Sequence, residues 1–168
     1  MKTTGFLFIL LLGVVFVGCS YFAEPAETVE LNSLFSSNMV LQQGEPISIW
    51  GTASPKDKVT IKIAGQKRGA IAAEDSTWLI KLDAMDAGGP FEMRVFGKDT
   101  LTLANVMIGE VWVCSGQSNM EMPLAGWGEI NNFEEEIAAA DYPDIRLFTV
   151  QRDMSTQPLD TVTTTGWQ

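Results

Sequence analysis

The chain has 168 residues, with 11 basic and 21 acidic side chains and no histidine, which gives a formal net charge of −10 at pH 7. An apolar content of 46% with 19% charged residues is typical of a globular protein and not of a disordered one. The acidic balance argues against nucleic acid as a partner, because phosphate backbones are themselves negative. Carbohydrate and other uncharged or weakly charged substrates are compatible with it.

The first residues predict export. Lys2 is followed by an apolar run that ends at Val17. This run is too short for a membrane-spanning helix, which needs about 20 residues, and is typical of a signal peptide. The next two residues are Gly18 and Cys19, and a small residue followed by cysteine resembles a bacterial lipoprotein signal, in which the cysteine is lipidated.

We therefore expect residues 1–18 to be a lipoprotein-type signal peptide and residues 19–28 a polar tether. The protein would be exported to the bacterial cell envelope, in the periplasm or at the outer membrane, and anchored by lipid on Cys19. A general signal peptide with an incidental cysteine is the alternative. Cys114 then has no disulfide partner, and its apolar sequence neighbours predict a small buried side chain.

Residues 29–106 are predicted to form a β-sandwich domain. Short stretches with period-two alternation are separated by turn residues every ten to fifteen positions or so, the spacing of antiparallel sandwiches. Alternation marks strands that are buried on one face, with Lys58 and Lys62 on the outward side. The clearest strands are 47–50, 59–63 and 91–95, and Gly88-Gly89-Pro90 is among the predicted turns.

Residues 107–168 predict the beginning of an α/β domain. Residues 101–113 are apolar and less cleanly alternating, as expected for a strand covered on both faces. A helix is predicted over 131–140, capped by Asn131 or Asn132, and a second strand over 145–150. Strand, helix and strand in this order open a parallel α/β sheet. No clear element is predicted for 151–168.

The turn between that first strand and the residues after it carries the chemistry. Ser118 would be exposed as a nucleophile where the strand ends, with its backbone N–H as one oxyanion donor. Gly116 permits a sharp turn or a close substrate approach, while Gln117 and Asn119 support the turn. The string is not a Gly-x-Ser-x-Gly elbow, because Met120 replaces the second glycine.

The residues around this turn resemble the nucleophile block of the sialate O-acetylesterases, a family of the SGNH hydrolase superfamily. Further segments resemble the same family's N-terminal β-domain and the sequence that follows the nucleophile. The matching segments are GEVWVC (109–114), SGQSNM (115–120), LFSSNMVLQQ (34–43), IWG (49–51), GGPF (88–91) and YPDIRLF (142–148).

This resemblance implies an acetyl-ester hydrolase in which Ser118 attacks the ester of an O-acetylated sugar. In the family a histidine oriented by an aspartate is the base, and these 168 residues contain no histidine. We therefore expect an N-terminal fragment, with an incomplete three-layer α/β/α SGNH domain over 107–168, that is inactive alone. The resemblance implies no metal or organic cofactor, and it leaves the oligomeric state open.

Two alternatives remain open at this point. One is an acetylxylan-type polysaccharide esterase with the same chemistry. The other is a surface lipoprotein that binds glycans without catalysis, in which the serine turn is purely structural. Among the tryptophans, Trp127 in its glycine-flanked loop is the candidate for lining a substrate pocket, whereas Trp50 and Trp78 are expected to pack in the core.

Overall fold

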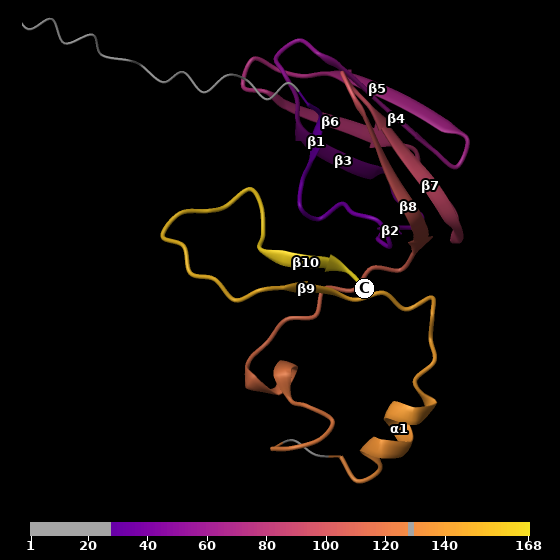
Figure 1. Cartoon of the computed structure of the whole chain (residues 1–168), viewed down its shortest axis with the longest axis vertical. Coiled ribbons are helices and arrows are strands. Elements are labelled where there is room, and N and C mark those ends of the chain that lie inside the picture. The colour runs from indigo at the N-terminus through magenta and orange to yellow at the C-terminus, as the bar shows by residue number, and fades with distance from the viewer. Residues whose placement is uncertain (1–27, 128–129) are drawn as a thin grey trace, which may run out of the picture.

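The computed structural model describes residues 28–127 and 130–168. The predicted signal peptide, nearly all of the tether and Cys19 lie outside the described residues. The described part of the chain is mostly β-strand, and its strands form three sheets (Figure 1).

Two of these sheets contain all the strands before residue 110. The smaller sheet is antiparallel and has the order β1-β3-β6, with β1 at Glu30–Leu31, β3 at Ile47–Thr52 and β6 at Thr77–Leu82. The larger sheet has the order β2-β8-β7-β4-β5, and only its β2–β8 pair is parallel. Its strands are Val40–Gln42, Thr100–Gly109, Gly88–Phe96, Lys58–Ile63 and Gln66–Ile71 in that order.

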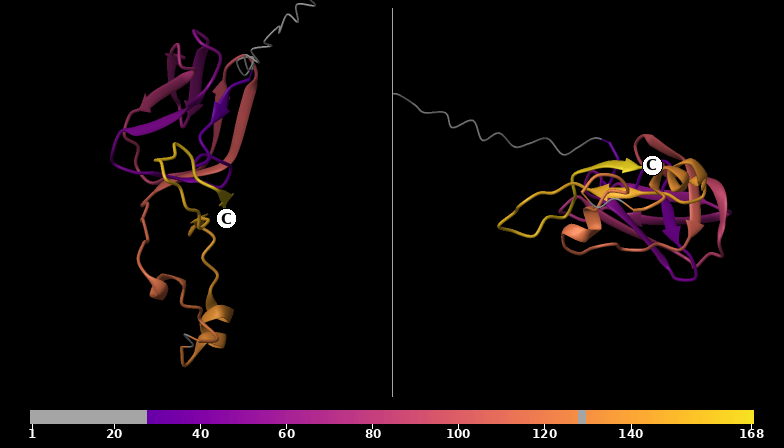
Figure 2. Two further views of the ribbon diagram at one scale, coloured as in Figure 1. Left: turned by 90° about the vertical axis from the view of Figure 1, so that its left-hand side faces the viewer. Right: turned by 90° about the horizontal axis from the view of Figure 1, so that it is seen from below.

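The apolar sides of the two sheets share one core, and Figure 2 shows the sheets stacked on each other. The predicted strands at 47–50, 59–63 and 91–95 lie within β3, β4 and β7, and their alternate residues are buried. Lys58 and Lys62 are exposed, as predicted. Fully buried side chains from both sheets fill the space between them, among them Ile49, Leu82, Val59, Ile61, Met93, Val95 and Val106.

One predicted turn is instead part of a strand. Gly88-Gly89-Pro90 begins β7, where the register against β8 is irregular between Gly88 and Phe91. Gly89 has a φ of 128°, and a Cβ there would lie 2.9 Å from the carbonyl oxygen of Val106. Glycine is needed because the chain bends against β8 at this point without leaving the sheet.

The predicted strand over 101–113 is wrong in its last four residues, 110–113. β8 ends at Gly109, beyond the predicted boundary at 106, and residues 110–117 form no regular element. Trp112 and Val113 are 82% and 93% exposed, and Cys114 is exposed rather than buried. An apolar run becomes a buried strand only when another element covers it, and no described residues cover this one.

Residues 110–147 extend away from the two sheets as a long excursion of the chain (Figure 2). The predicted helix is present as α1 (Phe133–Ala139), with Asn132 at its N-cap position. The Asn132 amide donates to Glu136 at 2.7 Å instead of capping the backbone. The expected apolar face is not covered, since α1 has no buried residue. Within the described residues, no helix is long and apolar enough to cross a membrane.

The end of the chain forms a hairpin and not a parallel pair. β9 (Phe148–Val150) pairs antiparallel with β10 (Thr164–Trp167), a strand that the sequence analysis left unassigned. The hairpin returns to the sheets, because the indole N–H of Trp167 donates to the carbonyl oxygen of Leu34 at 2.9 Å. The described residues therefore do not contain the predicted parallel strand–helix–strand unit.

Candidate active site

Ser118 begins a short 3₁₀-helix, η1 (Ser118–Glu121), in the excursion that follows β8. The preceding residue, Gln117, has an extended backbone with φ −102° and ψ −159°, so the chain turns sharply into the helix. Ser118 is exposed, and its hydroxyl makes no hydrogen bond with any residue that the structure describes. The position that the sequence assigns to a nucleophile is therefore sterically open.

The turn is held by its backbone. The N–H of Met120 donates to the carbonyl oxygen of Gln117 at 2.9 Å, and the N–H of Met122 donates to that of Asn119 at 3.4 Å. Gln117 and Asn119 thus contribute through their carbonyls to the turn that contains Ser118. A Cβ on Gly116 would lie 2.8 Å from Cγ of Met120, so a side chain there would have to displace the methionine.

The start of the excursion is fastened to β2. The carboxylate of Glu110 accepts hydrogen bonds from the side-chain amides of Gln43 at 2.6 Å and Gln42 at 3.3 Å. Gln42 also accepts the backbone N–H of Val111 at 2.9 Å. These contacts, with that of Gln43 the largest, hold the pKa of the Glu110 carboxyl below its ordinary value. The glutamine pair therefore sets the direction in which the chain leaves the sheet.

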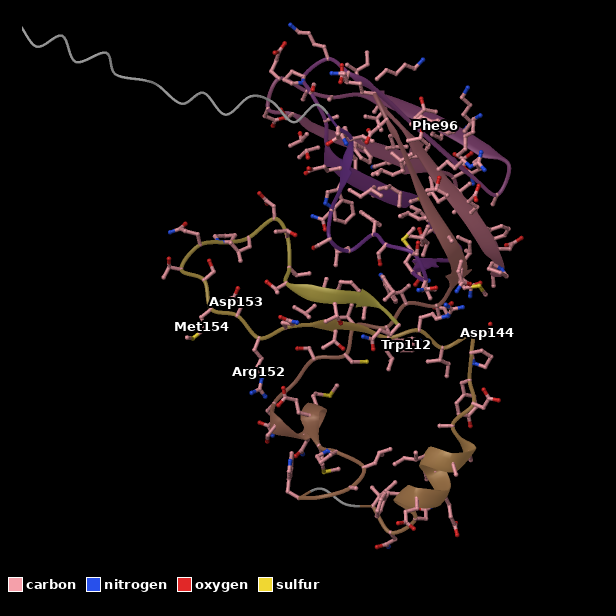
Figure 3. All side chains as sticks on the ribbon, in the orientation of Figure 1. Phe96, Trp112, Asp144, Arg152, Asp153 and Met154 are labelled. Carbon is pink, nitrogen blue, oxygen red and sulfur yellow. The ribbon has the colours of Figure 1, made fainter. Side chains whose placement is uncertain are left out.

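A second contact fastens the serine turn from the other side. Arg152, which follows β9, forms an ion pair with Glu121 at the end of η1. In Figure 3, Arg152 is labelled in the loop that follows β9, above η1, and its side chain is directed towards that helix. Both side chains are more exposed than buried, so the pair contributes little to stability, and its main effect is on position. No sequence pattern indicates this pair, because its members are 31 residues apart.

Trp127 lies in a loop that the backbone closes, since the N–H of Ile130 donates to the carbonyl oxygen of Leu124 at 3.0 Å. The indole is exposed. Two pockets on the β-rich part of the described residues are lined by other side chains, and neither includes Ser118 or Trp127. Ser118 and Trp127 are therefore both exposed on the same excursion, and they do not line either pocket.

Exposed apolar side chains come before and after the serine turn along the excursion. Trp112, labelled in Figure 3, and its neighbours Val111 and Val113 precede the turn. Others follow it, namely Met120, Met122, Leu124, Ile137, Tyr142, Ile145 and Leu147. Exposed apolar surface on this scale marks a region that normally contacts other protein.

The described residues include Ser118, which the sequence predicts to be a nucleophile, but no group in position to activate it. The chain has no histidine, and Glu121 is engaged with Arg152. Within 28–127 and 130–168, no three histidine, cysteine, aspartate or glutamate residues are arranged to hold a metal ion. A serine hydroxyl needs a base and oxyanion donors before it attacks an ester at a useful rate.

Comparison with known proteins gives the class to which the relatives of this chain belong. No protein-family model matches the chain. The crystal structure of a carbohydrate acetylesterase from Xanthomonas citri superposes on 84% of the chain with a TM-score of 0.79 and 32% identity, and the match covers 32% of that protein. The fold and the exposed serine turn therefore relate the chain to hydrolases of ester bonds.

The curated relatives of the chain are sialate O-acetylesterases. The mouse enzyme (Mus musculus) is 37% identical over an alignment of 145 residues, and the match covers 78% of this chain and 26% of the enzyme. The human enzyme (Homo sapiens) is 36% identical over 144 residues, with shares of 76% and 26%. The family resemblance predicted from the sequence is confirmed. The chain spans about a quarter of the length of the curated relatives that it matches.

Proposed function

We propose that this chain is the part of a carbohydrate O-acetylesterase that carries the nucleophile, Ser118. The observation that carries the proposal is the position of Ser118, exposed and unbonded at the start of η1, in a chain related to sialate O-acetylesterases.

In the proposed reaction, Oγ of Ser118 attacks the acetyl carbonyl carbon and passes its proton to a base. The tetrahedral oxyanion is held by donors that include the Ser118 N–H, which the start of a helix leaves without an intrahelical partner. The sugar oxygen then leaves with the proton, and an acetyl-serine ester remains. Water attacks this ester, and acetate and free Ser118 are released.

The base has to come from outside these 168 residues, because none of them is a histidine. A carboxylate whose conjugate acid has its ordinary pKa near 4 is too weak a base at neutral pH to replace an imidazole. We therefore propose that the 168-residue chain alone is inactive. Its contribution would be the nucleophile, the turn that presents it and one oxyanion donor.

We further propose that residues 107–168 are part of an α/β domain of the SGNH type and that 29–106 are a separate β-sandwich unit. The exposed apolar side chains of the excursion support this proposal, since a further layer would cover Trp112, Ile145 and Leu147. The hydrogen bonds of Glu110 and the Glu121–Arg152 pair would hold the serine turn while that layer packs on it.

The site of action in this proposal is the bacterial cell envelope, with the protein exported and anchored through lipid on Cys19. The support is the sequence alone, a basic residue and an apolar run ending at Gly18-Cys19. Anchoring would confine the enzyme to substrates that reach the cell surface or the periplasm.

Two tests address the catalytic proposal. The product of the complete gene should release acetate from an O-acetylated sugar, and Ser118→Ala should reduce turnover by about a millionfold. Mass spectrometry of the enzyme quenched during turnover should show an acetyl group on Ser118. Full activity in the alanine variant would refute the proposed nucleophile.

Two candidate substrates fit this chemistry, O-acetylated sialic acid and acetylated plant polysaccharide such as acetylxylan. The curated relatives favour the first by their names, while the structural relative is a carbohydrate acetylesterase without a stated sugar. Parallel assays on both substrates with the complete enzyme decide between them.

A further inference from the structure

A groove of about 850 Å³ lies on the smaller sheet, away from Ser118. Strands β1, β3 and β6, the end of β5, and residues 160–161 of the loop between β9 and β10 line it. Figure 1 shows this loop on the side of β1 and β3, and hydrogen bonds join its residues 160–162 to residues 32 and 33. The groove therefore combines residues from parts of the chain that are far apart in sequence.

The bottom of the groove is apolar and exposed. Trp50 on β3 is directly opposite Leu79 on β6, and Ile71 at the end of β5 also lines the groove. Leu79 and Ile71 are 52% and 69% exposed, so they are available for contact. Phe35 meets Trp50 edge-on, with ring centroids 4.7 Å apart, and thereby fixes the orientation of the indole.

The polar side of the groove is held by hydrogen bonds to the β9–β10 loop. The side-chain amide of Asn32 donates to the carbonyl oxygen of Asp160 at 2.7 Å. The hydroxyls of Ser33 and Thr161 are 2.7 Å apart, and Ser33 also accepts the N–H of Val162 at 3.2 Å. This loop is therefore a fixed wall of the groove and places the Asp160 residue at its edge.

Trp78 belongs to the core beneath the groove. The indole nitrogen of Trp78 is buried and has no hydrogen-bond partner among the described residues, although Trp78 is only 3% exposed. Trp78 and its cross-strand neighbour Gly51 both line the groove, and a Cβ on Gly51 would lie 2.9 Å from Cζ2, a ring carbon near that nitrogen. Glycine at position 51 therefore leaves room for the Trp78 indole beside the groove.

We propose that this groove binds a neutral saccharide chain. Sugar rings present apolar C–H faces and hydroxyl edges, which match an aromatic and aliphatic floor beside fixed polar groups. No lysine or arginine lines the groove, and its two ionisable residues are the carboxylic acids Glu30 and Asp160. Anionic sugars are repelled by these carboxylates, whereas carboxylate oxygens accept hydrogen bonds from neutral sugar hydroxyls.

The choice of a saccharide as ligand rests on the proposed function, but binding in the groove does not require catalysis. The groove would hold a neutral stretch of polysaccharide while acetylated units reach Ser118. It therefore favours a plant-type polysaccharide over a sialylated glycan as the substrate.

The test is a binding titration of the full 168-residue chain carrying Ser118→Ala, followed by tryptophan fluorescence and calorimetry. The probes are xylohexaose, cellohexaose and mannohexaose, with hexagalacturonate as an anionic hexamer of the same length. We expect at least one neutral hexamer to bind at least tenfold more tightly than hexagalacturonate. Asp160→Asn removes one repelling carboxylate, so it should raise the affinity for hexagalacturonate and reduce the difference between the two affinities.

Variants locate the binding. We expect Leu79→Ala and Ile71→Ala each to lower the affinity for the neutral hexamer at least threefold, and Trp50→Ala to lower it at least tenfold. Leu79 and Ile71 are exposed, so their replacement should not alter folding. Leu147→Ala, an exposed leucine outside the groove, is the matched control and should leave affinity unchanged. Failure of all three neutral hexamers to bind overturns the proposal, as does binding that Leu79→Ala and Ile71→Ala leave intact. Neither result bears on acetyl release by the complete enzyme, so the two proposals fail separately.

Discussion

Gln43 and Glu110 are joined by a 2.6 Å hydrogen bond between the side-chain amide of one and the carboxylate of the other. Gln43 follows β2, and Glu110 is the first residue after β8. The bond therefore lies where the larger sheet ends and the excursion to Ser118 begins. Two residues 67 positions apart in the sequence therefore fix the direction in which the excursion leaves the sheet.

The pKa of Glu110 reports on this bond. It lies below its ordinary value of 4.5 because Gln43, and to a smaller extent Gln42, donates to the charged carboxylate. Gln43→Ala should raise this pKa towards 4.5, measured by carboxyl-carbon NMR titration. The pKa of Asp75 is lowered by its hydrogen bond from Thr77 and should not move, which makes it an internal control.

The contribution of the same bond to folding stability depends on pH. Because the pKa of Glu110 is lower in the folded chain than in the unfolded one, the contribution is present above about pH 4.5 and is lost as pH falls through the folded-state pKa. The difference in thermal stability between the wild type and Gln43→Ala should therefore shrink on acidification through this range. A difference that grows towards acid would contradict the assignment.

Three cations form a row across neighbouring strands of the larger sheet. Lys62 on β4 is directly opposite Lys67 on β5 and Arg94 on β7, and neither lysine joins an ion pair among the described residues. Like charges in this arrangement repel by roughly 0.2–1 kcal/mol. Lys67→Glu should therefore raise the free energy of unfolding by a few tenths of a kcal/mol or more in low salt. The gain should fall at about 1 M salt, where the screening length is near 3 Å, and a gain that is independent of salt would exclude an electrostatic origin.

The core between the sheets should respond strongly to truncation. Ile49 is fully buried, so Ile49→Ala should lower the free energy of unfolding by about 2–5 kcal/mol in a urea titration. Ile145 is 64% exposed in the 168-residue chain, so Ile145→Ala should change it by less than about 0.5 kcal/mol. Equal effects of the two variants would contradict the buried core described here.

Lipidation at Cys19 can be tested in a bacterial host. Cells labelled with an alkyne fatty acid should yield labelled protein in the membrane fraction, and Cys19→Ala should abolish the label. Cys114→Ala is the matched control and should keep it, since Cys114 lies in the folded part of the chain. Label in the Cys19→Ala protein would remove the basis for the anchor.

The 168-residue chain by itself should not hydrolyse an aryl acetate in a Ser118-dependent way. Without an imidazole base, turnover should fall by about a millionfold relative to a complete serine site, to the level of the solution background. The wild-type chain and its Ser118→Ala variant should therefore give the same rate. A faster rate in the wild type would show that another group supplies the base.

Local patterns were sufficient for the strands that are buried on one face. Alternation predicts the positions of β3, β4 and β7, because each buried residue in them faces the same core. The motif around Ser118 likewise predicts an exposed serine in a turn, and Ser118 is exposed at the start of η1, although the strand predicted to lead into it ends at Gly109. Helix α1 follows from its sequence, although its apolar face is not covered.

The sequence by itself therefore determined the family resemblance and the positions of three sheet strands, and it predicted that Ser118 is exposed. Tertiary structure decided which apolar runs are buried. Residues 110–113 resemble a core strand, but a strand exists only where a neighbouring strand pairs with it, and none of the described strands pairs with these residues. Tertiary structure also brought Gln43 to Glu110 and Asn32 to Asp160, because contacts between distant residues depend on the folded path and leave no local pattern.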